Sequence, residues 1–218
     1  MNNIPMFTGA NGMATLILRE IPLCGRAYVL IRSVWNDRTE ALLEECAQFC
    51  RAAGAREIYV SDGRNALPAE PAHTVLELSV EKSALPLPEH PVPLVPLSKE
   101  NSQIYLDIYN RCFRDVVGTA SYDYRDINRL LGKDLAFLAM KDQKPAGIAE
   151  LGDNYLEGVA VDPAFRGLGR DLTLTALARL PGPVVKLKVH DCNTRALNLY
   201  RRLCCWKETV VSYWWKIG

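Results

Sequence analysis

Apolar residues recur along the first part of the chain at intervals that predict a small α/β unit. Three runs have the length and composition of strands: Ala27–Val34, Glu57–Val60 and Thr74–Val80. Between the first two, apolar residues recur at helical spacing (Leu42, Leu43, Cys46, Phe49, Cys50 and Ala53). Asp37, followed by Glu40, resembles a capping box before this helix. The predicted order of elements is therefore β-α-β-β.

The second part of the chain predicts a larger sheet with several helices. Ser98 can cap a helix whose apolar face holds Ile104, Tyr105, Ile108, Tyr109, Cys112 and Phe113. Strands are expected at Ala136–Met140, Ala146–Leu151, Tyr155–Val161 and Val184–Val189, and a final strand or hairpin is expected at Lys207–Ile217. Short turns join the first three, which predicts successive antiparallel strands. The fold class is therefore α/β, with a mixed, mainly antiparallel sheet covered by helices on both faces.

A run of prolines separates these two parts: Pro86, Pro88, Pro91, Pro93 and Pro96. A segment of this kind favours an extended polyproline conformation and forms a semi-rigid spacer. We therefore place a domain boundary near residue 88. A small α/β N-terminal region is expected at residues 1–88, and a second domain is expected at residues 89–218.

Candidate chemistry begins where the strand Tyr155–Val161 ends. Pro163 cannot continue a strand ladder because it has no N–H group, so the chain must turn there. Gly167 and Gly169 allow positive φ angles, and leucines at helical spacing follow them (Leu172, Leu174, Leu177 and Leu180). A helix that starts after such a loop presents unpaired N–H groups and the positive end of its dipole. This combination suits a phosphate or pyrophosphate group.

Two motifs in this part of the chain resemble those of a known family. The first, V-x-P-x-x-R-G-x-G, is formed by Val161, Pro163, Arg166, Gly167 and Gly169. The second, N-x-x-A-x-x-L-Y, is formed by Asn193, Ala196, Leu199 and Tyr200, with Leu203 after it. One R-G-x-G sequence is a weak signal, but both motifs in a strand–loop–helix–strand–helix order are much more specific. The chain from Val92 to Gly218 therefore resembles the GNAT superfamily of acetyl-CoA-dependent N-acetyltransferases.

This resemblance implies both a fold and an activity. In the family, a mainly antiparallel mixed sheet is splayed beside its fourth strand, here Tyr155–Val161, and the pantetheine arm of acetyl-CoA lies in the gap. The implied reaction transfers acetyl from the cosubstrate acetyl-CoA to a small-molecule or peptide amine by direct attack. Residues 1–88 lack both motifs. They form either a degenerate GNAT-like half, as in tandem members, or an unrelated α/β extension.

The family's cofactor contacts fall on the strand, the loop and the second motif. The resemblance implies contacts to acetyl-CoA by Val159, Ala160, Val161, Arg166, Gly167, Leu168, Gly169, Arg170, Asp171, Asn193 and Tyr200. The N–H group of Val159 would polarise the acetyl carbonyl, and backbone donors across Arg166–Arg170 would hold the pyrophosphate. Asn193 would bind the pantetheine arm or cap the following helix. No metal ion is implied.

Two catalytic side chains are implied in the same way. Attack on a thioester needs a neutral amine, and most amines are protonated near neutral pH, so a base is required. Glu157 occupies the strand position where many family members carry a glutamate base, although an exposed or ion-paired residue could equally stand there. Glu150 is the substitute candidate. Tyr200 matches the tyrosine that can protonate the departing thiolate, or it packs on the pantetheine arm.

Asp171 departs from the family pattern, because the motif usually ends in glycine or alanine at this position. A carboxylate about 4 Å from a pyrophosphate charge costs about 4 kcal/mol at an effective dielectric constant of about 20, and about 1 kcal/mol if it is hydrated. Arg170, next to it, could neutralise the carboxylate. A second class of function therefore stays open. The chain could be a GNAT-like module that binds CoA weakly or not at all and acts as a scaffold or regulatory partner.

Composition limits the remaining classes of function. The 218 residues carry 26 Lys and Arg against 25 Asp and Glu, a formal net charge of +1, which favours neither nucleic acid nor an anionic membrane as a partner. No apolar run approaches the roughly 20 residues that span a bilayer, and the N-terminus lacks a signal-peptide pattern, so a cytoplasmic protein is expected. Seven cysteines without framework spacing indicate reduced thiols, with Cys46 and Cys50 in a core.

The acceptor side of the site is less specific in sequence. A set of polar and aromatic residues follows the helix of the second part: Tyr122, Asp123, Tyr124 and Asp126. They either form a short helix and loop that covers the acceptor site in the family, or they are solvated surface residues. Their acids, with Glu150 and Asp153, are compatible with a cationic amine such as a polyamine, an aminoglycoside or a lysine side chain. His190 is either a proton carrier or a structural residue.

Overall fold

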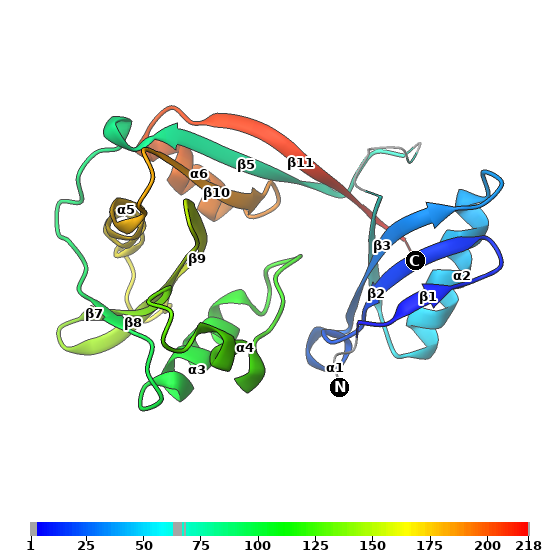
Figure 1. The fold of residues 1–218 in the computed structure, drawn as a ribbon, viewed down its shortest axis with the longest axis horizontal. Helices are drawn as coiled ribbons and strands as arrows, with labels where there is room; N and C mark the ends of the chain where they lie inside the picture. Colours follow the sequence, from blue (N-terminus) through cyan, green and yellow to red (C-terminus); the bar gives the residue numbers. More distant parts are fainter. Residues whose placement is uncertain (1–3, 63–66, 68, 218) are drawn as a thin grey trace. The chain divides into compact units, whose positions relative to one another are not determined.

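The computed structural model describes residues 4–62, 67 and 69–217, and its chain forms two compact units (Figure 1). The N-terminal unit comprises Met1–Val75, His190–Cys192 and Val210–Gly218. The C-terminal unit comprises Leu76–Val189 and Asn193–Thr209. Two long strands, β5 (His73–Glu81) and β11 (Lys207–Lys216), contribute residues to both units. The division therefore differs from a single boundary at residue 88, because residues 76–88 lie in the C-terminal unit.

The N-terminal unit is a mixed sheet packed against one long helix. Its strands are β1 (Met6–Thr8), β2 (Gly12–Ile17), β3 (Arg26–Val34), β4 (Glu57–Ser61) and the end of β11, in the order β1-β2-β3-β4-β11. The β3–β4 pair is parallel, and the other pairs are antiparallel. A short helix, α1 (Ile21–Cys24), precedes β3, and α2 (Thr39–Ala52) joins β3 to β4. The predicted β-α-β order is confirmed.

The core of this unit lies between α2 and one face of the sheet. Leu42, Cys46 and Cys50 of α2 are fully buried. They belong to one apolar cluster with strand residues that include Leu16, Val29, Ile58 and Val60. Burial raises the pKa of the Cys46 thiol to about 12 and that of the Cys50 thiol to about 11, so both thiols stay protonated. The predicted core role of these two cysteines is confirmed.

Two features of the N-terminal unit differ from the sequence analysis. The residue before α2 is Arg38, whose side chain makes no capping hydrogen bond, and Asp37 adopts a left-handed φ of 55° in the preceding turn. The predicted Asp37 cap is therefore wrong. The hairpin of β1 and β2 was not predicted. β1 has only three residues, and β2 has one polar side chain, Thr15, among its six residues, so neither shows a clear alternation of apolar and polar positions.

In the C-terminal unit, the strand order of the mixed sheet is β5-β10-β9-β8-β7-β6. Its further strands are β6 (Leu94–Pro96), β7 (Ala136–Lys141), β8 (Lys144–Leu151), β9 (Tyr155–Val161) and β10 (Val184–His190). The β6–β7, β7–β8 and β8–β9 pairs are antiparallel, and β9 and β10 are parallel. Asp142 and Gln143 connect β7 to β8 with positive φ angles of 49° and 61°, as a two-residue type I′ turn requires. The predicted mixed, mainly antiparallel sheet is confirmed.

Helices cover both faces of this sheet, as predicted. They are α3 (Ser102–Phe113), α4 (Tyr124–Leu130), α5 (Gly169–Arg179) and α6 (Thr194–Leu203). Side chains of α3 and α4 share one core with Ile148 of β8, whereas side chains of α5 and α6 share another with Ala149. Adjacent residues of a strand point to opposite faces of its sheet. The two pairs of helices therefore lie on opposite faces.

The proline-rich segment is part of the C-terminal unit and does not form the expected semi-rigid spacer between domains. A 3-10 helix (Lys82–Ala84) precedes it, and its last residues form β6, which pairs with β7. Val92 is 4% exposed, and its N–H group donates to Thr175 Oγ1 of α5 at 3.1 Å. The predicted Ser98 cap is also wrong, because α3 begins at Ser102. The Ser98 N–H group donates to Asn101 Oδ1 at 2.9 Å, in the turn before the helix.

Candidate functional site

β9 separates from β10 beyond the first residues of the pair. Their parallel register joins Lys186 to Tyr155 and Leu187 to Leu156. β8, on the other side, pairs with β9 as far as Val161. In the part of the chain that the structure describes, the later β9 backbone therefore has no strand partner on the β10 side. Unpaired N–H and C=O groups at a strand edge can bind an extended ligand as an added strand would bind.

The turn after β9 leads directly to the start of α5. Asp162 Oδ1 accepts the N–H group of Ala164 at 3.0 Å, which fixes the turn. Gly167 has a φ of 93°, a left-handed angle that glycine adopts without strain. α5 begins at Gly169, and no side chain caps it. The first N–H groups of α5 are thus available to an anion, and the predicted sequence of strand, glycine-bearing turn and helix is confirmed.

Asp171, in the first turn of α5, is bound to the proline-rich segment. Its Oδ1 atom accepts the backbone N–H group of Glu89 at 3.0 Å, and its Oδ2 atom lies 3.6 Å from His90 Nδ1. Arg170 Nη1 lies 3.5 Å from Asp171 Oδ1 and 3.0 Å from Glu89 Oε1. The Asp171 side chain is 18% exposed. The proposed neutralisation by Arg170 is therefore present as an ion pair, and the carboxylate has further partners.

A pocket of about 820 Å³ adjoins the loop before α5. Residues 90–93 of the proline-rich segment, residues 140–143 around the β7–β8 turn, Arg166–Leu168 and Asp171 line it. This volume lies in the range of small-molecule sites, which is about 300–1,000 Å³. The pocket therefore has the size of a ligand site, and it lies beside the predicted anion-binding loop.

Two residues of the second motif lie in and beside α6. Tyr200 is 7% exposed in the core that α5 and α6 share, and burial raises its pKa to about 12. Asn193 Oδ1 accepts the N–H group of Ala196 at 3.2 Å, so Asn193 caps α6. Of the two roles considered for Asn193, the structure shows the helix cap.

The register of β8 and β9 shifts at Glu157. Glu150 lies opposite Gly158, and Leu151 lies opposite Leu156. Glu157 is therefore the extra residue of a β-bulge, which re-aims side chains locally. It is exposed, and its carboxylate lies near Cα of the residue after β8, because a Cβ built on Gly152 would lie 2.8 Å from Glu157 Oε1.

The second carboxylate, Glu150, lies among tyrosines. Its Oε2 atom accepts the Tyr105 hydroxyl at 3.2 Å, and the Tyr122 hydroxyl lies 3.0 Å from both carboxylate oxygens. Burial raises the pKa of Glu150, and the hydrogen bonds from the tyrosines partly oppose this rise.

Asp123, which follows Tyr122 in the chain, caps α4 in a capping box with Asp126. The predicted short helix is confirmed.

The sequence did not identify the tyrosine partners of Glu150. The sequence predicts Tyr105 on the apolar face of a helix, and it predicts Tyr122 either in a short helix and loop that covers the acceptor site or on the solvated surface. The available signal was weak, since a buried tyrosine usually finds a partner for its hydroxyl but the sequence does not say which one. The sequence also did not identify the contacts of α5 with the proline-rich segment, which involve Glu89, His90 and Thr175. These contacts join residues more than 80 positions apart in the chain.

His190 belongs to the N-terminal unit, where its ring lies 5.0 Å from that of His73. Burial lowers its pKa to about 4, so it is neutral near neutral pH.

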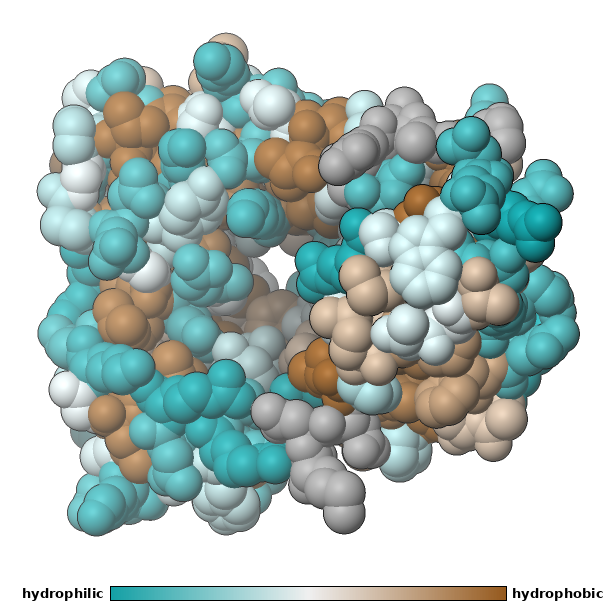
Figure 2. Space-filling view, turned by 45° about the vertical axis from the view of Figure 1, so that its right-hand side comes forward, coloured by the Kyte–Doolittle hydropathy of each residue, from teal (hydrophilic) through white to brown (hydrophobic). Residues whose placement is uncertain are grey.

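Among the described residues, no three His, Cys, Asp or Glu side chains are arranged to hold a metal ion. None of the described helices has the length and apolarity that a membrane crossing requires. On the face shown in Figure 2, hydrophilic residues separate smaller groups of hydrophobic ones.

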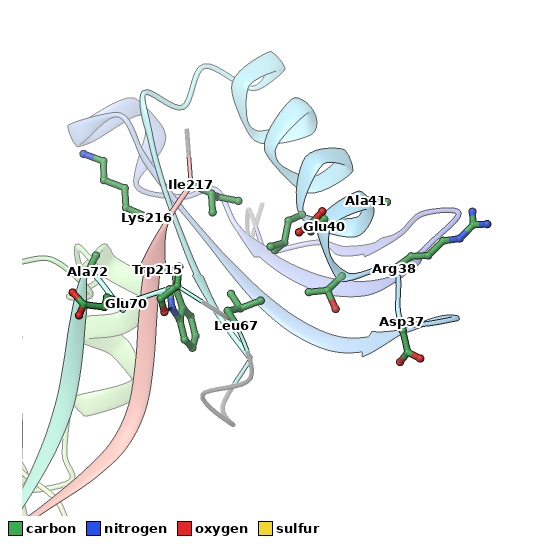
Figure 3. Close-up of a pocket in the computed structure, with 13 residues that line it drawn as sticks. Asp37, Arg38, Glu40, Ala41, Leu67, Glu70, Ala72, Trp215, Lys216 and Ile217 are labelled. Atoms are coloured by element: carbon green, nitrogen blue, oxygen red, sulfur yellow. Dashed lines mark hydrogen bonds between the residues drawn. The ribbon is translucent and has the colours of Figure 1, made fainter.

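The N-terminal unit has its own strand–turn–helix–strand segment, formed by β3, α2 and the parallel β4. A pocket of about 720 Å³ lies at the start of α2, with apolar walls from Leu43, Leu67, Trp215 and Ile217 (Figure 3). Asp37 and Glu40 stand at the start of this helix, whereas the C-terminal unit has glycines there. Carboxylates repel a phosphate group. The N-terminal unit thus repeats the topology of the loop without its two glycines.

Comparisons with known proteins identify this architecture. The family model described as "Acetyltransferase (GNAT) family" matches residues 103–204. Among solved structures, the chain is similar to a functionally unknown conserved protein from Staphylococcus epidermidis. The two share 17% sequence identity over 98% of this chain and 94% of that chain, with a TM-score of 0.60.

Two further structures have the same fold. One is a GCN5-related N-acetyltransferase from Sphaerobacter thermophilus, with 15% identity, 94% of this chain and 76% of that chain covered, and a TM-score of 0.57. The other is a tandem GNAT protein from the clavulanic acid biosynthesis pathway, with 14% identity, 97% and 81% covered, and a TM-score of 0.50. No curated protein matches the chain. The GNAT-like fold extends over the whole chain, and residues 103–204 match the model of the acetyltransferase (GNAT) family.

Proposed function

We propose that the protein is an N-acetyltransferase that moves an acetyl group from acetyl-CoA to a primary amine by direct attack. The observation that carries this proposal is the unpaired edge of β9, which runs into the uncapped start of α5. Acetyl-CoA has a long arm with amide groups and a pyrophosphate. An open strand edge suits the arm, and the start of a helix suits the pyrophosphate.

The residues along this stretch fit acetyl-CoA. When bound, acetyl-CoA supplies a thioester, with an electrophilic carbonyl carbon and a sulfur that can leave. Val159, Ala160 and Val161 would offer backbone groups to the pantetheine arm, and N–H groups from Arg166 to Arg170 would hold the pyrophosphate. A Cβ atom built on Gly167 meets no atom within 4 Å, so the loop leaves room for phosphate oxygens near the backbone.

Three groups of the chain would act on the reacting atoms. The Val159 N–H group would donate to the carbonyl oxygen and stabilise the negative charge that develops there. One carboxylate of this part of the sheet, Glu157 or its substitute Glu150, would take the proton of the amine. The Tyr200 hydroxyl would give its proton to the sulfur as the carbon–sulfur bond breaks. Because its pKa is about 12, Tyr200 is protonated at neutral pH and has this proton to give.

A second candidate function is a CoA-binding scaffold without turnover. Asp171 favours it, because a carboxylate in the first turn of α5 lies close to the proposed pyrophosphate site. Its bonds to Glu89 and Arg170 favour the enzyme instead, since they offset its charge. The two candidates predict different behaviour with amines.

The test is incubation of the protein with acetyl-CoA and a chemically diverse panel of primary amines, with free thiol and acetylated product measured together. We expect at least one amine to give both products in equal amounts. Tight binding of acetyl-CoA without thiol release for every amine would support the scaffold and contradict the enzyme.

A further inference from the structure

Glu150 lies beside the position where the proposed reaction takes place. It is paired with Gly158 across the β8–β9 ladder, and the next residue of β9 is Val159. Directly opposed residues of antiparallel strands have Cα atoms about 4.5–5.5 Å apart. A Cβ atom built on Gly158 would lie 3.7 Å from Glu150 Cβ. The stem of Glu150 therefore lies over Gly158, one residue from the N–H group proposed to hold the acetyl oxygen.

The tyrosines orient this carboxylate but fill only part of its capacity to accept hydrogen bonds. Tyr105 and Tyr122 each have one hydroxyl hydrogen to donate, so together they supply two hydrogen bonds to Glu150. An ionised carboxylate has about four lone-pair positions. About two positions are therefore left for a cationic donor, and a primary ammonium group has three N–H bonds to offer.

Aromatic rings form the walls around this carboxylate. The Tyr122 ring stacks on the Tyr109 ring at a centroid distance of 3.7 Å, and the Tyr109 and Phe113 centroids lie 4.7 Å apart. The Cβ atom built on Gly158 would also lie 3.9 Å from Phe113 Cζ. A carbon atom at this position would therefore touch both Glu150 and Phe113, which leaves little room for a branch. A partly buried carboxylate among aromatic side chains suits an ammonium group on an unbranched carbon, because its charge is screened less there than in water.

Glu157 lacks these features. It is exposed and stands in the bulge, outside the regular alternation of β9. Its carboxylate lies beside Gly152, at the turn between β8 and β9. A charge in water attracts a cation weakly, whereas a partly buried charge attracts it more strongly. Glu157 still influences Glu150 through its own negative charge.

The geometry points to Glu150, and not Glu157, as the group that binds the acceptor's primary ammonium and removes its proton, in a tyrosine-walled recess that selects an unbranched alkylammonium. This inference rests on the proposed function and names the acceptor class for it. One proton moves from the ammonium nitrogen to a Glu150 oxygen. The freed nitrogen lone pair then forms the bond to the acetyl carbon, and the carbon–sulfur bond breaks as Tyr200 protonates the sulfur. The second proton that the nitrogen loses on becoming an amide restores the Tyr200 hydroxyl.

The charges around Glu150 suit a base that works near neutral pH. Burial is the largest effect and raises its pKa, and the negative charges of Glu157 and Asp126 raise it further. The hydroxyls of Tyr122 and Tyr105 lower it. Catalytic bases are most effective when their pKa lies near the working pH. The carboxylate acts only when it is deprotonated, so the rate should fall as the pH drops below its pKa.

The matched variants Glu150→Gln and Glu157→Gln test this assignment, since each removes one charge from neighbouring strands and keeps the side-chain shape. Loss of a catalytic base typically costs about 10²–10⁴-fold, so Glu150→Gln should lower kcat/KM for the amine by at least about a hundredfold. An exposed charge contributes about 0.2–1 kcal/mol, so Glu157→Gln should change kcat/KM by less than about fivefold. Both variants should bind acetyl-CoA as the native protein does.

The outcomes separate this inference from the proposed function. Native turnover that survives Glu150→Gln, or that is lost in Glu157→Gln instead, overturns the assignment and leaves the acetyltransferase intact. Absence of turnover by the native protein with every amine overturns both. With the native protein, unbranched primary alkylamines should have higher kcat/KM values than amines branched at the carbon next to nitrogen. The reverse order would contradict the narrow recess.

A second variant covers the case in which Glu150→Gln does not fold. Tyr122→Phe removes a hydrogen bond that favours the ionised carboxylate, so the pKa of Glu150 should rise and the acid limb of the kcat/KM profile should move to higher pH. Glu157→Gln removes a nearby negative charge and should move the same limb to lower pH. A limb that stays in place in both variants would show that Glu150 is not the titrating base.

Discussion

Replacing Asp171 tests how strongly its carboxylate acts on a bound pyrophosphate. Asp171→Asn removes the charge but keeps an oxygen that can accept the Glu89 N–H group, whereas Asp171→Ala removes both. A carboxylate that faced the pyrophosphate at about 4 Å would oppose binding by about 1 to 4 kcal/mol, depending on hydration. Its removal would then strengthen binding of acetyl-CoA by about tenfold to about a thousandfold.

The contacts of Asp171 favour the lower end of this range. Arg170 and His90 lie 3.5 Å and 3.6 Å from its oxygens, and the Glu89 N–H group donates to it at 3.0 Å. We therefore expect Asp171→Asn to strengthen acetyl-CoA binding by less than about tenfold. The hydrogen bond to Glu89 should contribute about 0.5–1.5 kcal/mol to stability. Asp171→Ala should lower the free energy of unfolding by about this amount, and Asp171→Asn by less.

Calorimetric titration of acetyl-CoA and urea denaturation measure the two effects separately. Titrations at low and high salt provide a control, because salt screens any remaining repulsion and should reduce the difference between native protein and Asp171→Asn. A hundredfold or greater gain in affinity for Asp171→Asn would show that the carboxylate faces the pyrophosphate. An unchanged free energy of unfolding for Asp171→Ala would show that its bond to the proline-rich segment contributes nothing.

Three further predictions follow from single residues. Tyr200→Phe should lower kcat by about 10²-fold or more with little change in acetyl-CoA affinity, because it removes the proposed proton donor. Steady-state kinetics in which the native protein and Tyr200→Phe have equal kcat values would refute this role. Gly167→Ala should lower the free energy of unfolding by about 1 kcal/mol, since φ is 93° there, and Gly169→Ala is the matched control in urea denaturation; equal losses would contradict the strain argument. The pKa of His190 is about 4 in the folded protein and about 6.5 in the unfolded chain. The contribution of neutral His190 to the free energy of unfolding should therefore be fully present above pH 6.5 and be lost as the pH is lowered toward 4. Urea midpoints that change with pH by the same amount in the native protein and in His190→Gln would contradict this.

The segment that was predicted best from sequence is the one where local chemistry fixes the backbone. The strand Tyr155–Val161 has the predicted bounds in the structure. Pro163 forces a turn after it, and two glycines mark the start of α5. These signals are local, so no information about distant contacts was needed. The second motif placed α6 for the same reason.

Contacts between distant segments were not predictable in the same way. The hydrogen bond from the Glu89 N–H group to Asp171 joins residues 82 positions apart. Asp171 departs from the family pattern in the loop, but in the structure it holds the proline-rich segment against α5. The bulge at Glu157 depends on the register with β8, which side-chain periodicity does not encode. The sequence therefore named both candidate carboxylates but could not show which one the tyrosines hold.

Helix starts were a further source of error. Asp37 and Ser98 both have side chains that favour caps, yet α2 and α3 begin one or more residues later, after turns with other hydrogen bonds. Cap residues also favour turns, because their side chains bind nearby backbone groups in either setting. Tertiary packing then decides which residue begins the helix.

The most direct test of the central claim is a titration of the ¹⁵N-labelled protein with acetyl-CoA, followed by the shifts of its backbone amides. At 24.4 kDa the chain is accessible to this method. The account predicts that the largest saturable shifts fall on the amides of Val159–Val161 and Gly167–Arg170. Binding with shifts confined to other segments, or no saturable shift at all, would contradict the claim that the edge of β9 and the start of α5 hold acetyl-CoA.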